Sequence, residues 1–115
     1  MANKIIVLGA GLVGSAIAID LSHQHEVTSA DINEEALNKF KNFPKIKTVQ
    51  ADLSQPEAIN NLVADYDLVI GAVPGFMGFQ TLKTVIEAGK NIVDISFMPE
   101  DFLQLNNKAK ENGVT

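Results

Sequence analysis

Residues 4–14 of the chain read KIIVLGAGLVG, an apolar run that passes directly into the spacing G-x-G-x-x-G. The run predicts a buried strand over Lys4–Leu8, and the residues that follow predict a helix over Leu12–Ser22. A second strand, Glu26–Ala30, ends directly before an acid, Asp31, which lies 17 positions beyond the last glycine. Strand, glycine turn, helix, strand and carboxylate together predict a βαβ unit that binds a dinucleotide.

Each glycine of this turn has its own physical task. Gly9 lies where the chain turns sharply from strand to helix, which favours a residue without a Cβ. Gly11 lets the backbone approach a pyrophosphate, and Gly14 lets the helix pack closely on the sheet. The N–H groups at the helix start, beginning with Leu12 and Val13, then bind the negative phosphates. A tight turn without a ligand is the alternative, and the flanking strands and the acid argue against it.

Asp31 is expected at the end of the second strand, where a carboxylate accepts hydrogen bonds from the cofactor's adenine ribose. The same charge would repel a 2′-phosphate, so the sequence favours NAD over NADP. All nine basic residues are lysines, and the next residues, Ile32 and Asn33, offer no guanidinium to bind a phosphate. Ile32 directly follows Asp31, and both residues are candidate cofactor contacts. The alternative role for Asp31 is to cap the next helix, but Asn33 suits that role and would leave Asp31 free.

Length and composition bound what the chain does. Its 115 residues, 46% of them hydrophobic, predict one ordered domain. A formal net charge of -5 and scattered lysines argue against a nucleic-acid surface, and no apolar run approaches the length of a membrane span. The absence of cysteine excludes disulfides and thiol nucleophiles, and residues 1–4 leave no room for a signal peptide, so we expect a cytoplasmic protein.

Short apolar strands alternate with helices along the rest of the chain, which predicts an α/β fold. Right-handed crossovers then give a doubly wound parallel sheet (Rossmann fold) of strand order 3-2-1-4-5. Ser54 is expected to cap the third helix, and Gly89 to end the fourth. Residues 113–115 resemble the start of a sixth strand, so we expect a fragment of a longer protein, truncated before that strand. The remaining expected strands are Lys47–Ala51, Leu68–Ala72 and Asn91–Ile95, and the remaining expected helices are Glu34–Phe40, Pro56–Ala64, Gly78–Ala88 and Pro99–Asn112.

Three further segments should lie at the carboxyl ends of the strands, where ligands bind in such folds. Asp52 and Leu53 follow the third strand, where Leu53 would cover the adenine; a turn or cap role for Asp52 is the equal alternative. The segment Ala72-Val73-Pro74-Gly75 follows the fourth strand and suits close approach to the nicotinamide half, although a plain turn also explains it. Asp94 ends the fifth strand, where a structural role is favoured.

Two other groups of residues receive different interpretations. His23 and His25 lie at the end of the first helix without an arranged carboxylate partner, so we expect a solvated terminus and no metal site. Four of six large apolar residues are expected in loops on the ligand side. They either fold into the local core or, as favoured here, meet another domain or subunit, including another copy in a homo-oligomer. The six residues are Phe76, Met77, Phe79, Phe97, Met98 and Phe102.

Four stretches carry a family resemblance: VLGAGLVG at 7–14, ADLS at 51–54, LVIGAVPGFMGF at 68–79 and VDISFMPE at 93–100. With them the chain resembles the amino-terminal cofactor domain of the saccharopine dehydrogenase family, most closely its lysine 6-dehydrogenase-like branch. The first stretch occurs in many Rossmann proteins, whereas the last two are much more specific. The resemblance covers essentially the whole chain but only part of a typical family member.

The resemblance implies an oxidoreductase that transfers hydride between NAD and a C–N bond of an amino acid, with the cofactor supplying the chemistry. It implies that the substrate domain and most catalytic residues lie beyond Thr115, so the chain alone would be inactive and no catalytic residue is assigned. A nucleotide-sensing regulatory domain of a potassium channel or transporter is the alternative, and a free-standing NAD-binding scaffold is a third. The segments 73–76 and 94–100 favour the dehydrogenase, because a sensor has no evident use for them.

Overall fold

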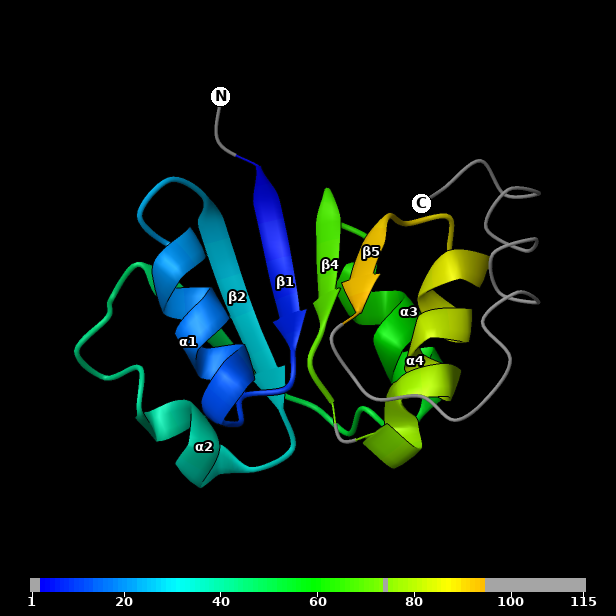
Figure 1. Cartoon of the computed structure of the whole chain (residues 1–115), viewed down its shortest axis with the longest axis horizontal. Helices are drawn as coiled ribbons and strands as arrows, with labels where there is room; N and C mark the ends of the chain where they lie inside the picture. The colour runs from blue at the N-terminus through cyan, green and yellow to red at the C-terminus, as the bar shows by residue number, and fades with distance from the viewer. Residues whose placement is uncertain (1–2, 74, 95–115) are drawn as a thin grey trace.

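The computed structural model of the chain describes residues 3–73 and 75–94, without the side chains of 75–79 and 94. It contains one five-stranded parallel sheet of order β3-β2-β1-β4-β5, which confirms the predicted Rossmann topology (Figure 1). The strands are β1 (Lys4–Leu8), β2 (Glu26–Asp31), β3 (Ile46–Gln50), β4 (Leu68–Gly71) and β5 (Ile92–Asp94). The helices are α1 (Leu12–Leu21), α2 (Glu34–Asn38), α3 (Pro56–Val63) and α4 (Gly75–Glu87).

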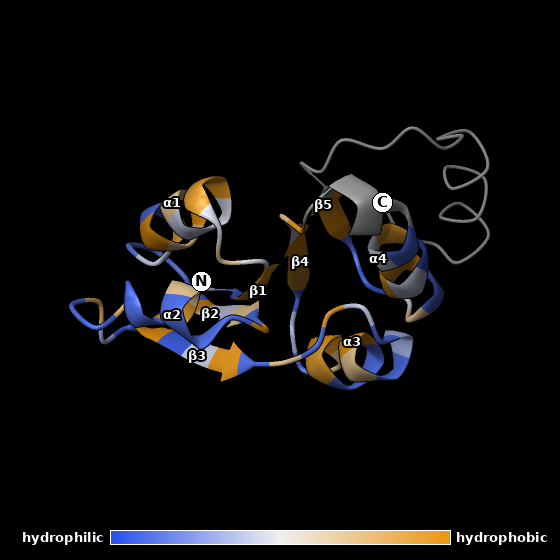
Figure 2. Cartoon of the chain, turned by 90° about the horizontal axis from the view of Figure 1, so that it is seen from below, coloured by the Kyte–Doolittle hydropathy of each residue, from blue (hydrophilic) through white to orange (hydrophobic). Residues whose placement is uncertain are grey.

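The helices cover both faces of the sheet. Figure 2 looks at the carboxyl ends of the strands, with α1 and α2 on one face and α3 and α4 on the other. Leu8 pairs with Ala30 of β2 and with Gly71 of β4, so these three strands end at nearly the same level. The turns that follow β1, β2 and β4 therefore meet at one edge of the sheet. None of the helices in the described part of the chain has the length and apolar character needed to cross a membrane.

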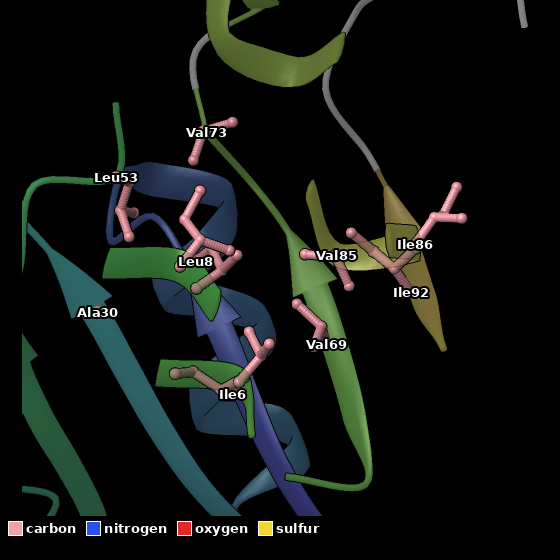
Figure 3. Close-up of a cluster of buried hydrophobic side chains, with 11 residues drawn as sticks. Ile6, Leu8, Ala30, Leu53, Val69, Val73, Val85, Ile86 and Ile92 are labelled. Carbon is pink, nitrogen blue, oxygen red and sulfur yellow. The ribbon is translucent and has the colours of Figure 1, made fainter. Parts of the chain in front are cut away.

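Each face of the sheet has its own buried core, because β1 points alternate apolar side chains to opposite sides. Ile6 and Leu8 pack with α3 and α4 (Figure 3), and Ile5 and Val7 pack with α1 and α2. The first cluster also contains Leu53, Ile59, Val63, Val69, Val73, Val85, Ile86 and Ile92. The second also contains Ala18, Val27, Leu37, Phe40, Ile46 and Ile70. Burial on both faces explains why β1 and β4 read as continuous apolar runs.

The carboxyl end of α4 and the amino end of α3 can be compared with the caps predicted for them. Gly89 ends α4 as predicted: it has φ of +75°, and the N–H groups of Gly89 and Lys90 donate to the carbonyls of Ile86 and Val85. The prediction that Ser54 caps α3 is wrong. Gln55 occupies that position without a side-chain hydrogen bond, and the Ser54 hydroxyl donates to Asp52 instead.

The start of α4 also differs from the sequence prediction, which placed it at Gly78. The helix begins at Gly75, directly after β4 and its short turn. Phe76 and Met77 therefore lie in a helix and not in a loop, which corrects the prediction for these two, whereas Phe79 was already expected in a helix. Phe97, Met98, Phe102 and the predicted helix Pro99–Asn112 lie outside the described residues.

A single tyrosine joins α3 to the sheet. The hydroxyl of Tyr66, which follows α3, donates to Oγ1 of Thr28 in β2 at 2.9 Å. Thr28 is buried, so this bond pairs two hydroxyl groups that would otherwise lose their hydrogen bonds with water. It fixes the carboxyl end of α3 against the middle of β2.

Candidate functional site

The glycine turn is held to the strands on either side of β1. The Gly9 N–H donates to the Ala30 carbonyl at 2.7 Å, and the Ala72 N–H donates to the Leu8 carbonyl at 2.8 Å. Gly9 has φ of +108°, and a Cβ there would lie 2.8 Å from the carbonyl carbon of Ala72. A Cβ at Gly14 would collide with the Gly9 carbonyl. The fold itself therefore requires glycine at positions 9 and 14.

Gly11 differs from its two neighbours in the motif. Its φ is -69°, a value that any residue adopts, and a Cβ built there meets no atom within 4 Å. Gly11 is the N-cap of α1 and lies exposed at the edge of the sheet. Glycine is favoured moderately as an N-cap, but neither its backbone dihedral angles nor packing within the described chain requires a glycine here. The free space lies directly at the positive end of a helix that is 10 residues long.

Asp31 ends β2 beside this turn, as predicted, but it is not free. Its Oδ2 accepts a hydrogen bond from the Ala10 N–H at 2.7 Å, and its Oδ1 accepts one from the Asn33 N–H at 2.8 Å. Asn33 caps α2 as predicted, since its Oδ1 accepts from the N–H groups of Glu35 and Ala36. A carboxylate has about four acceptor positions, so Asp31 keeps capacity for ligand hydroxyls.

Lys39 reaches the same turn, and sequence reasoning missed it. Its Nζ donates to the Ala10 carbonyl at 2.8 Å from the residue that ends α2. The Ala10 N–H thus donates to a carboxylate, and the Ala10 carbonyl accepts from an ammonium group. No local pattern separates Lys39 from Lys41, and only the packing of α2 beside the turn brings it to Ala10.

Three large apolar side chains are exposed at this edge. Leu12 is 88% exposed, Val13 60% and Ile32 58%. The first two lie in the first turn of α1, and Ile32 follows Asp31. Apolar groups around an anion-binding helix start suit a ligand that joins phosphates to flat ring systems.

The segment after β3 folds back on itself. Oδ1 of Asp52 accepts from both the N–H and the hydroxyl of Ser54, and these hydrogen bonds hold the pKa of Asp52 below its usual value. Leu53 is only 6% exposed and belongs to the core, so little of its side chain is left to cover a ring. These contacts match the alternative role of Asp52 as a turn residue.

The segment after β4 lies beneath and beside the glycine turn. Ala72 contacts the space next to Gly9 and Gly14, and Val73 is buried in the core. Pro74 lies outside the described residues, and Gly75 begins α4, so the starts of α1 and α4 meet at the same edge of the sheet. The Asp94 backbone pairs with Gly71, while its side chain is not described.

A separate cavity of about 390 Å³ lies at the opposite, amino-terminal ends of the strands and contains none of the predicted site residues. It is lined by Lys4, His25, Glu26, Val27, Thr28, Lys45, Lys47, Asp65 and Tyr66. An enclosed volume is not needed for a dinucleotide that lies along an open sheet edge, so the glycine turn remains the stronger candidate. Within residues 3–73 and 75–94, no group of three or more His, Cys, Asp or Glu side chains could hold a metal ion.

Comparison with known sequences identifies a family model that covers nearly the whole chain. The family model described as "Saccharopine dehydrogenase NADP binding domain" matches residues 5–115. A saccharopine dehydrogenase [NADP(+), L-glutamate-forming] of Pyricularia oryzae is 28% identical over 118 residues, covering 100% of this chain and 26% of its own length. An alpha-aminoadipic semialdehyde synthase of Arabidopsis thaliana is 25% identical over 91 residues, covering 79% of this chain and 9% of its own. The chain thus spans about a quarter or less of these relatives.

Solved structures agree on the fold. Apo saccharopine dehydrogenase (L-Glu forming) of Saccharomyces cerevisiae has a TM-score of 0.86 at 21% identity, covering 99% of this chain and 26% of its own. GenD2 from gentamicin A biosynthesis, in complex with NAD, has a TM-score of 0.77 at 21% identity, covering 99% of this chain and 33% of its own. At these identities the likeness shows the Rossmann-like fold alone.

Proposed function

Because the chain belongs to the family of saccharopine dehydrogenase NADP-binding domains, we propose that it binds a nicotinamide dinucleotide for hydride transfer at a C–N bond of an amino acid. The cofactor would lie across the carboxyl ends of β1, β2 and β4, and it would supply the redox chemistry. The amino-acid substrate and the groups that move protons would belong to other parts of a longer protein. We propose a cytoplasmic location for it, with which a chain free of cysteine is compatible.

The observation that carries this proposal is the empty space at Gly11. The fold needs glycine at 9 and 14, but at 11 the backbone is ordinary and the Cβ direction is open. A glycine that the protein does not need for itself is explained by a ligand that approaches the backbone. The ligand would be anionic, because the N–H groups of Leu12 and Val13 begin α1 at this point.

The other site residues then take roles along the cofactor. Asp31 would accept hydrogen bonds from the adenine ribose, and Ile32, 58% exposed, would pack against the adenine. Asp52 and Leu53 would border the adenine mainly through backbone, since their side chains are engaged in a turn and in the core. The segment after β4 would border the nicotinamide half of the cofactor through Ala72, Val73, Pro74 and Gly75. We propose NAD as the preferred form, because the Asp31 carboxylate disfavours a 2′-phosphate.

Replacement of Gly11 by valine tests the proposal. The fold should tolerate Gly11→Val, because the space is open, and the loss of a glycine N-cap should lower the free energy of unfolding by only about 1 kcal/mol. Calorimetric titration with NAD should show at least about a tenfold loss of affinity, which corresponds to roughly 1.4 kcal/mol. Ala16→Val is the matched control, since it adds branched bulk at an exposed position of the same helix. Equal binding of NAD by Gly11→Val and by the control would refute the proposed site.

A further inference from the structure

Ala10 is held at both ends by side chains of opposite charge. Its N–H donates to the Asp31 carboxylate at 2.7 Å, and its carbonyl accepts from the Lys39 ammonium at 2.8 Å. The two partners come from the end of β2 and the end of α2, 21 and 29 residues away along the chain. Two hydrogen bonds and the span of one residue put the two charges within roughly 9 Å of each other. A carboxylate and a cation therefore flank the same residue of the glycine turn.

Both charges lie where the adenosine end of a cofactor would pass. Asp31 and the exposed Ile32 end the second strand, and α2 begins directly after them. NAD and NADP differ in this region only, where NADP carries a phosphate on the 2′-oxygen of the adenine ribose. A carboxylate repels that phosphate and binds the free hydroxyls, whereas an ammonium attracts the phosphate.

We infer that Asp31 and Lys39 form an opposed pair that sets the ratio of NAD to NADP affinity, with Lys39 providing the cation for a 2′-phosphate. This inference rests on the proposed function, because it concerns the same cofactor. The inference adds Lys39 to the proposed cofactor site. The chain has no arginine that could bind a 2′-phosphate, but it places the Lys39 ammonium at this end of the site. The domain then prefers NAD only modestly and still accepts NADP.

The chemistry of lysine suits this role. Lys39 is exposed, and its stem is flexible, so its ammonium can exchange the neutral Ala10 carbonyl for a phosphate oxygen and form a stronger, charge-assisted bond. Lysine acts as a point charge and lacks the two-pronged geometry of arginine. It therefore compensates the repulsion from Asp31 only in part. The Ala10 N–H keeps its bond to Asp31 throughout, so the turn does not have to move.

The test compares both cofactors in matched lysine variants of the whole chain. Lys39→Met keeps the length of the side chain and removes its charge, and Lys41→Met does the same two residues further on at an exposed position. We expect Lys39→Met to weaken NADP binding by about tenfold, measured by titration calorimetry, and to change NAD binding by about twofold or less. Lys41→Met should change neither. Lys39→Arg should retain or improve NADP binding.

Substitution of Asp31 should change the ratio of NAD to NADP affinity in the opposite direction to substitution of Lys39. Asp31→Asn should raise the affinity for NADP relative to NAD, and the double variant with Lys39→Met should return the ratio toward that of the wild type. An equal loss for both cofactors in Lys39→Met, or an unchanged ratio, overturns the inference and leaves Lys39 as a structural link between α2 and the turn. Failure of the wild type to bind either cofactor overturns the proposed function together with the inference, so the two failures are distinguishable.

Discussion

Two aspartates at the same edge of the sheet share a local bond to the N–H two residues on, but only Asp31 also binds a residue far away along the chain. Asp31 follows β2 and binds the N–H of Ala10, which lies 21 residues away. Asp52 follows β3 and binds Ser54, which lies two residues away. Both are short acids after a parallel strand, so their sequence contexts look alike. The difference shows that the bond across the sheet, and not the residue type, distinguishes the aspartate that holds the glycine turn of the candidate site from the one that only closes its own turn.

The same contrast extends to the two turns. The glycine turn is tied to β2 through Gly9 and to the end of α2 through Lys39, and Leu8, directly before the turn, is tied to Ala72 after β4. The turn after β3 is closed mainly by local bonds of Asp52, although Ala51 still pairs with the Asp31 carbonyl. Damage to the first turn should therefore spread through the sheet, and damage to the second should stay local.

The largest expected effect is from a methyl group at Gly9. Gly9→Ala forces an L-residue to φ of +108° and places its Cβ against the Ala72 carbonyl, so the free energy of unfolding should fall by about 3 kcal/mol or more. Chemical denaturation with urea measures the change. Gly11→Ala is the control, and it should remain close to the wild type in stability. If the two variants were equally stable, the strain assigned to Gly9 would be wrong.

An intermediate effect separates the two aspartates. Asp31→Ala leaves the N–H of Ala10, a residue with 0% exposure, without its carboxylate partner, and should cost about 1–3 kcal/mol of stability. It should also remove the proposed preference for NAD over NADP. Asp52→Ala should change stability less and should leave the cofactor preference as it was, because its carboxylate serves the turn. Urea denaturation and calorimetric titration of both variants would expose a cofactor role for Asp52, if it has one, as a shifted preference.

The smallest expected effect is a pH dependence at Asp52. The Ser54 hydrogen bonds lower the pKa of this carboxyl in the folded state, so its contribution to stability is present above the unfolded pKa of about 3.9 and is lost as the pH falls through the lower folded pKa. The gap in melting temperature between wild type and Asp52→Asn should therefore shrink between pH 6 and about pH 3. A gap that widens toward low pH would contradict the assigned direction.

Local patterns were sufficient to predict most of the fold. The bounds of β1, the strand order, the Asn33 cap and the Gly89 terminus all follow from apolar periodicity and turn chemistry, and all are confirmed. The start of α4 was misplaced because Pro74-Gly75 reads as a loop, although both residues are compatible with a helix start. The predicted cap of α3, Ser54, lies one residue before the observed N-cap, Gln55.

In the candidate site, the sequence predicted only the roles of the residues that belong to the G-x-G-x-x-G motif. Gly9, Gly11 and Gly14 have the spacing and the surroundings that the pattern requires. The bonds of Asp31 and Lys39 to Ala10 depend on how β2 and α2 lie beside the turn, which no pattern along the chain records. Likewise, Leu53 is buried in a core cluster with residues far from it along the chain, such as Leu8 and Val85.

The bond between Tyr66 and Thr28 has a practical consequence. Tyr66 is the single tyrosine of the chain, which has no tryptophan, so near-ultraviolet emission comes essentially from one ring. That ring lies where the end of α3 meets β2. Its fluorescence therefore gives a built-in, label-free optical signal of when this helix leaves the sheet during unfolding.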